Sequence, residues 1–99
     1  MNLLIKNLVK ELIIGTKKII NIKEFYFDKE TEEKLMNMLL YQLNKPSIEQ
    51  SKTPTQIVNE FLYDEFRESF ALTPYDFGEK AHKLIIEWGI QKTKDMHDE

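Results

Sequence analysis

Three carboxylates repeat at every fourth residue in the second half of the chain. Glu60, Asp64 and Glu68 would line one ridge of a helix, because side chains four residues apart share a helical face. Such a ridge can hold a divalent cation or present a paired acid and base. More often it is a solvent-facing surface, and Arg67 follows Asp64 at the spacing of an ordinary surface ion pair. We therefore interpret the ridge as exposed surface, not as a catalytic site.

The other residue types that do chemistry are isolated from one another. His82 and His97 lie far apart, and neither has a second histidine four residues away or a glutamate-rich metal signature around it. The glycines stand singly, so no phosphate-cradling loop is present, and no serine has the glycine-rich setting of a nucleophile elbow. The sequence therefore predicts a protein that is not an enzyme and that carries no metal and no cofactor.

Aromatic residues concentrate between positions 61 and 77, where acidic residues are interleaved with them. Helical spacing assigns four of these aromatics to the core, namely Phe61, Phe66, Phe70 and Phe77. Tyr63 and Tyr75 remain as surface residues, and residues 30–79 carry ten acids against four bases. Aromatic anchors dominate the energetics of many protein interfaces. We expect a surface that binds a basic partner protein, formed by Tyr63, Tyr75, Asp64 and Glu68.

The elements that would position these residues are mostly helices, with one break in the periodicity. Residues 2–14 have helical spacing, and Gly15 follows them as a helix stop. Residues 19–28 alternate instead as a strand whose isoleucines and phenylalanines face opposite sides, so a β-bulge or bend is expected between Lys23 and Glu24. A lone strand cannot satisfy its own backbone hydrogen bonds. We therefore expect it to pair with another strand, in the same chain or in a second copy, which makes a homodimer an early expectation.

Helix-capping signals divide the remainder of the chain. Asp28 is placed to cap one helix, whose first turn is acidic. Thr53-Pro54-Thr55-Gln56 combines an N-cap, a proline at the first helical position and a capping-box glutamine, and it opens a helix over residues 54 to about 70. Thr73-Pro74-Tyr75-Asp76 repeats this pattern and opens the last helix.

Together these elements predict a single small domain over residues 1–99. Its class is α+β but mainly α-helical, with about four helices and one strand or short β-ribbon. Residues 93–99 are polar and are expected to form a flexible tail. An apolar fraction of 41% suffices for one core, although a chain of 99 residues buries only a modest share of its surface, which again favours a homodimer.

The order strand, helix, helix between residues 20 and 70 resembles the ribbon-helix-helix family of dimeric DNA-binding regulators. The resemblance lies in Phe25-Tyr26-Phe27-Asp28-Lys29-Glu30 running into Leu35, and in Thr53-Pro54-Thr55-Gln56-Ile57-Val58 opening the second helix. It implies that two copies pair their strands into a ribbon whose exposed face reads the DNA major groove. The residues placed to contact DNA are Lys17, Lys18, Lys23 and Tyr26. The connection from Asn44 to Lys52 is longer than the tight turn of the family, so DNA binding is our alternative interpretation.

The composition also bears on compartment and origin. The apolar N-terminal segment is interrupted by Lys6, Lys10 and Glu11, and no small-residue cleavage site follows, so we expect neither a signal peptide nor a membrane span. The chain has no cysteine, which is typical of a reducing cytoplasm. Lysine far exceeds arginine and isoleucine far exceeds valine, which indicates an AT-rich gene and, with the small size, a virus or other mobile element. The leading prediction is a non-enzymatic protein that acts on a host or viral protein, in the host cytoplasm if it is viral.

Overall fold

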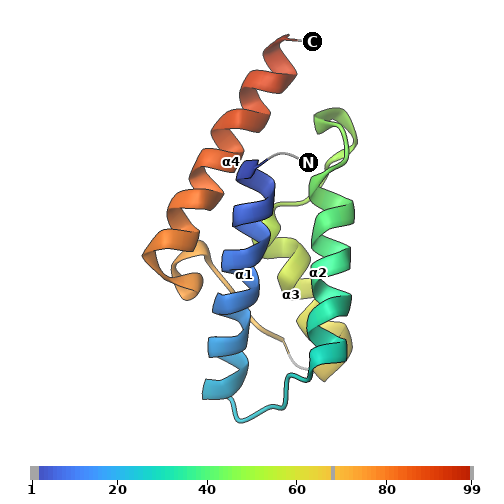
Figure 1. Cartoon of the computed structure of the whole chain (residues 1–99), viewed down its shortest axis with the longest axis vertical. Helices are drawn as coiled ribbons and strands as arrows, with labels where there is room; N and C mark the ends of the chain where they lie inside the picture. The colour runs from blue at the N-terminus through green and yellow to red at the C-terminus, as the bar shows by residue number, and fades with distance from the viewer. Residues whose placement is uncertain (1–2, 68, 99) are drawn as a thin grey trace.

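The computed structural model describes residues 3–67 and 69–98, and this part of the chain is helical with loops. Its four α-helices are α1 (Leu3–Ile22), α2 (Lys29–Leu43), α3 (Pro54–Phe66) and α4 (Gly78–Asp98). Two short 3-10 turns, η1 (Ser47–Glu49) and η2 (Pro74–Phe77), precede α3 and α4. In Figure 1, α1 lies between α2 and α4, and α3 lies behind them. The last turns of α4 extend beyond the other helices, at the end of the molecule where α1 begins (Figure 1).

The predicted strand is wrong, and the α+β class is wrong with it, because residues 3–67 and 69–98 contain no strand. Residues 19–22 form the last turn of α1 instead. The buried stripe of α1 continues at four-residue steps through Leu8, Leu12, Thr16 and Ile20. Ile20 therefore belongs to the buried face of a helix. The alternation of isoleucines and phenylalanines after it had suggested a strand instead. The reason for expecting a partner strand disappears with the strand itself, and the homodimer stays a prediction.

The bend expected between Lys23 and Glu24 is the C-terminal cap of α1. Phe25 N–H donates to the Ile20 carbonyl and Glu24 N–H donates to the Asn21 carbonyl, each at 3.1 Å. This pair of bonds, with Glu24 in the left-handed region at φ 62°, is the Schellman arrangement that commonly closes a helix. The chain turns sharply here, and it reaches α2 through residues 25–28 without forming a strand.

Gly15 does not stop the first helix but lies inside α1, where it is buried. A Cβ atom built on Gly15 would lie 2.6 Å from Cδ1 of Phe77 and 3.0 Å from its Cα. The backbone of η2 therefore packs directly against α1 at this point, which only glycine allows. The glycine that we interpreted as a helix stop is a site of close packing between two segments that lie far apart in the sequence.

The hydrophobic core lies between the helices. Its largest fully buried aliphatic members are Leu8, Leu12, Ile20, Leu35, Leu39, Leu43, Val58 and Leu62. Ion pairs join neighbouring helices at the surface: Lys17 with Glu32, Lys34 with Glu65, and Lys80 with Glu11. Exposed pairs of this kind contribute about 0–1 kcal/mol each, so burial of the core supplies most of the stability. The polar end of α4 is helical to Asp98, and the mobility expected for residues 93–99 stays a prediction.

Asp28 caps α2 as its position in the sequence predicts. Its Oδ1 accepts a hydrogen bond of 2.8 Å from the Thr31 N–H. The hydrogen bonds to Thr31 lower the pKa of the Asp28 carboxyl from its ordinary value of 3.8. The cap therefore stabilises the fold at pH above that value and is lost as the pH falls through the lowered pKa.

We expect Asp28→Ala to lower the Tm at pH 7 and the difference from the native protein to shrink as the pH drops below about 3.8. Asp28→Asn keeps an acceptor oxygen without titrating, so its Tm should lie above that of Asp28→Ala by an amount that does not vary with pH. Thermal melts followed by circular dichroism between pH 2 and pH 7 would measure both. A constant difference between Asp28→Ala and the native protein across this range would contradict the capping role of the carboxylate.

Candidate functional site

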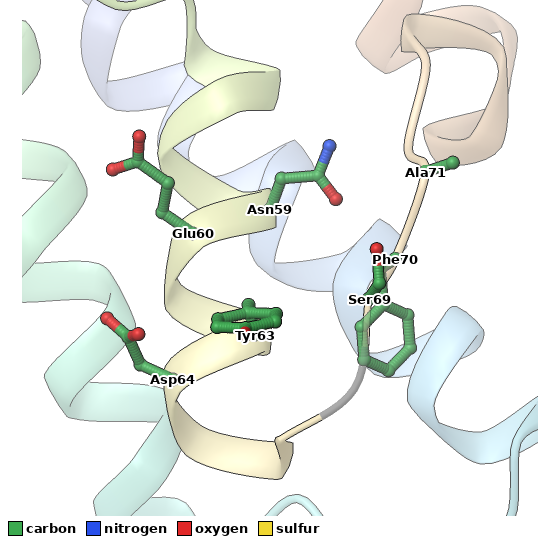
Figure 2. Close-up of a pocket in the computed structure, with 7 residues that line it drawn as sticks. All are labelled: Asn59, Glu60, Tyr63, Asp64, Ser69, Phe70 and Ala71. Atoms are coloured by element: carbon green, nitrogen blue, oxygen red, sulfur yellow. The ribbon is translucent and has the colours of Figure 1, made fainter.

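A cleft of about 570 Å³ lies between α3 and the extended segment 69–71. Figure 2 shows α3 as one wall and the returning chain as the other, with α1 behind them. The helical residues of the wall are spaced four apart in two rows, so they share one side of α3. The lining residues are Asn59, Glu60, Tyr63, Asp64, Ser69, Phe70 and Ala71.

The local sequence explains why α3 can hold this wall. Thr53 Oγ1 accepts from the Gln56 N–H at 3.2 Å, and Gln56 Oε1 accepts from the Thr53 N–H at 2.9 Å, which forms the predicted capping box. The opposite side of α3 is buried in the core through Ile57, Val58, Phe61 and Leu62. This burial fixes the rotation of the helix, so the cleft residues face outward.

The helix predicted to reach about residue 70 ends at Phe66, and the cleft exists because of this early end. Arg67 adopts the left-handed conformation at φ 52° and ψ 33°. That conformation is uncommon outside glycine, and it turns the chain out of the helical path. Residues 69–71 can then run back beside α3 instead of extending it (Figure 2).

Phe70 and Asn59 hold the returning segment in place. Phe70 is buried, its ring meets Phe25 edge to face at a centroid distance of 6.3 Å, and the Lys23 ammonium lies 4.7 Å from its ring centroid. Asn59 Oδ1 accepts a long hydrogen bond of 3.4 Å from the Leu72 N–H. Both walls of the cleft are thus anchored by contacts that do not involve a ligand.

The open side of the cleft combines an aromatic ring with carboxylates. The Tyr63 side chain is 59% exposed. In Figure 2 its ring lies between the carboxylates of Glu60 and Asp64 on one side and segment 69–71 on the other. A cation between such groups would meet an aromatic face and a negative charge together, and both attract it. This arrangement of groups is suited to bind a cationic side chain.

The two carboxylates differ in their partners. Glu60 forms an exposed ion pair with Lys52 at 2.5 Å. Asp64 makes no ion pair within the described residues, although it lies near enough to contribute to the raised pKa of Lys34, whose main cause is the ion pair with Glu65. Asp64 is therefore the carboxylate of the cleft that is available to a ligand without breaking an existing pair.

The structure brings together some of the residues expected on the protein-binding surface. Tyr63 and Asp64 line the cleft, whereas Glu68 lies outside the described residues. Tyr75 belongs to η2, away from the cleft lining, and its ring stacks on His82 at a centroid distance of 4.2 Å. Asn59 and segment 69–71 were not anticipated, because no sequence signal marked the left-handed turn that brings them together.

The residues predicted to contact DNA do not lie on a β-ribbon in the described part of the chain. Lys17 pairs with Glu32 of α2 at 2.6 Å, and Lys23 lies over the Phe70 ring. Lys18 and Tyr26 are exposed, on α1 and on the loop that follows it. The strand that would carry a major-groove reading face is not present in the described residues around them. DNA binding through these side chains stays a prediction.

Two further observations bear on the class of site. Among residues 3–67 and 69–98, no group of three or more histidine, aspartate or glutamate side chains could hold a metal ion. No helix in the same ranges combines the length and the apolar character needed to cross a bilayer. No protein-family model, curated protein or solved structure matches this chain.

Proposed function

We propose that this protein acts without catalysis, by binding a basic segment of a partner protein in the cleft between α3 and segment 69–71. The observation that carries the proposal is that the cleft lining combines the exposed Tyr63 ring with the Asp64 carboxylate, which forms no ion pair within residues 3–67 and 69–98. The lysine-rich, isoleucine-rich composition supports the further proposal that it is a viral or mobile-element protein acting in the cytoplasm on a host or viral protein.

The energetics favour an extended segment over a single side chain. A cation over an exposed aromatic ring contributes about 0.5–1 kcal/mol, and an exposed ion pair contributes about 0–1 kcal/mol. Together, these two contributions give only weak binding. Segment 69–71 is itself extended, and neither Ser69 nor Ala71 forms a backbone hydrogen bond with another described residue. A peptide laid beside this segment would add main-chain hydrogen bonds to the contacts of its basic side chains.

Selection from a library of random peptides would test the proposal without knowledge of the partner. We expect the selected peptides to be enriched in arginine and lysine. Tyr63→Ala should weaken their binding roughly two- to fivefold, which corresponds to the loss of about 0.5–1 kcal/mol from a cation over an exposed ring. Tyr41→Ala is the matched control, because Tyr41 is 67% exposed but lies on α2 outside the cleft.

A third variant, Tyr75→Ala, would define the extent of the binding surface. Since Tyr75 does not line the cleft, we expect this variant to bind the selected peptides as the native protein does. Equal losses for Tyr63→Ala and Tyr75→Ala would indicate the wider aromatic surface expected from the sequence. Selected peptides without basic enrichment, or binding that is insensitive to Tyr63→Ala, would refute the proposed cleft.

A further inference from the structure

A second hollow of about 590 Å³ lies between α1 and α2, and it shares no lining residue with the cleft. Its lining on α1 runs from Leu3 to Lys17, which at 1.5 Å per residue is a length of about 21 Å. Val9 and Ile13 lie among the lining residues and are only 3% and 5% exposed. The hollow is therefore an elongated groove, and its most buried apolar atoms can be reached only by a side chain that enters it.

Basic residues line this apolar groove. Three lysines belong to its lining, Lys6, Lys10 and Lys17, whereas its acidic lining residue is Glu32. Glu32 already pairs with Lys17 at 2.6 Å. Lys6 and Lys10 are exposed and form no ion pair with any described residue. The groove thus combines apolar surface with two positive charges that have no ion-pair partner in the described part of the chain.

We propose that this groove binds an amphipathic helix of another protein, one whose apolar stripe is flanked by acidic residues. The length of the groove matches about four helical turns, so apolar side chains at helical spacing could enter it in a row. Acidic residues beside that stripe would meet Lys6 and Lys10. This surface is independent of the cleft, which attracts basic groups.

Two other occupants fit the groove less well. A second copy that presented the same groove would place the lysine-rich linings of both copies in one interface, and like charges across an interface are repulsive. An anionic bilayer satisfies the lysines, but a planar surface does not reach the nearly buried Val9 and Ile13. An inserted helix satisfies both the charges and the shape.

The test uses two synthetic helical peptides of about 16 residues with the same leucine stripe, one flanked by glutamates and the other by lysines. Fluorescence anisotropy should give an affinity roughly tenfold higher for the glutamate-flanked peptide. Lys10→Glu should abolish this preference. Lys18→Glu is the matched control, since Lys18 is exposed on α1 but does not line the groove, and it should keep the preference. Circular dichroism would confirm that both variants are folded.

Several results would overturn the proposal. These are equal affinity for the two peptides, no binding of either, or the same loss in Lys18→Glu as in Lys10→Glu. Binding to phosphatidylglycerol vesicles that displaces the glutamate-flanked peptide would assign the groove to a membrane surface instead. A dimer in sedimentation equilibrium that is lost on Ile14→Asp would assign it to a second copy, because Ile14 lines the groove and is 41% exposed.

Discussion

Gly15→Ala should destabilise the protein, whereas Gly89→Ala should stabilise it, although both glycines lie inside helices. Alanine has the higher helix propensity by about 1 kcal/mol, so propensity alone favours both changes. At position 89 a Cβ would meet nothing within 4 Å, and the gain is free of steric cost. At position 15 it would lie 2.6 Å from Cδ1 and 3.0 Å from Cα of Phe77. The second of these atoms is backbone, so η2 as a whole must move.

The size of the effect follows from overpacking in a buried contact. Such changes cost about 1–3 kcal/mol, which for a domain of this size lowers the Tm by roughly 5–20 °C. Gly15→Val should be more damaging than Gly15→Ala, because it adds two further methyl groups at the same contact. Thermal and urea unfolding of the three variants would measure the differences. A Gly15→Ala protein that is as stable as Gly89→Ala would show that η2 does not pack closely on α1.

Asp64→Lys should reduce the affinity for selected basic peptides by about a hundredfold, with little effect on folding. The change removes a cleft carboxylate that forms no ion pair with any described residue and replaces it with an ammonium, so a cationic ligand meets repulsion instead of attraction. Like-charge contacts at an interface cost several kcal/mol, and each 1.4 kcal/mol is tenfold in affinity. Asp64 is exposed, and substitutions at exposed sites usually change stability by no more than about 0.5 kcal/mol.

Glu87→Lys is the control for this experiment because it alters the net charge by the same amount from α4, outside the cleft. Its effect on affinity should be small and should disappear at high salt, since it acts only through long-range attraction. Isothermal titration calorimetry at two salt concentrations would separate the local effect from the general one. Equal losses in the two variants would mean that net charge, and not the cleft, governs binding.

The helix starts could be predicted because their signals are local. The capping hydrogen bonds of Asp28 and Thr53 join each of them to a residue three positions away, so the sequence nearby contains the necessary information. Thr73 also makes such bonds to Asp76, but they open the 3-10 turn η2 before α4 begins. The signal identified the position of the turn and not the type of helix that it opens.

The predictions that proved wrong concern segments whose conformation depends on contacts with residues far away in the sequence. Ile20 and Ile22 fit a strand as well as a helix end, and the burial of Ile20 beside Leu12 and Thr16 decides in favour of the helix. Glycine is a residue type that often ends a helix, and for this reason Gly15 was predicted to do so. Its presence is explained instead by the close packing of Phe77, which is far away in the sequence. Short segments with two acceptable periods cannot be assigned from sequence alone.

In the candidate site, too, one wall could be predicted from the local sequence and the other could not. Tyr63 and Asp64 could be placed on a surface because the helical spacing of α3 left them off the buried stripe. The second wall depends on the left-handed Arg67, and arginine is a residue that rarely adopts this conformation. Phe70 was correctly expected in the core, but its role in anchoring the cleft wall could not be inferred without that turn.

The most direct test of the cleft is a titration of the ¹⁵N-labelled protein with a library-selected basic peptide, followed by amide chemical shifts. The proposed function predicts that the largest shifts lie at Asn59, Tyr63, Asp64 and segment 69–71, on both walls of the cleft. The amides of α1 and α2 that line the groove should change little. Shifts concentrated on η2 around Tyr75, or on the groove, with the cleft unchanged, would contradict binding in the cleft.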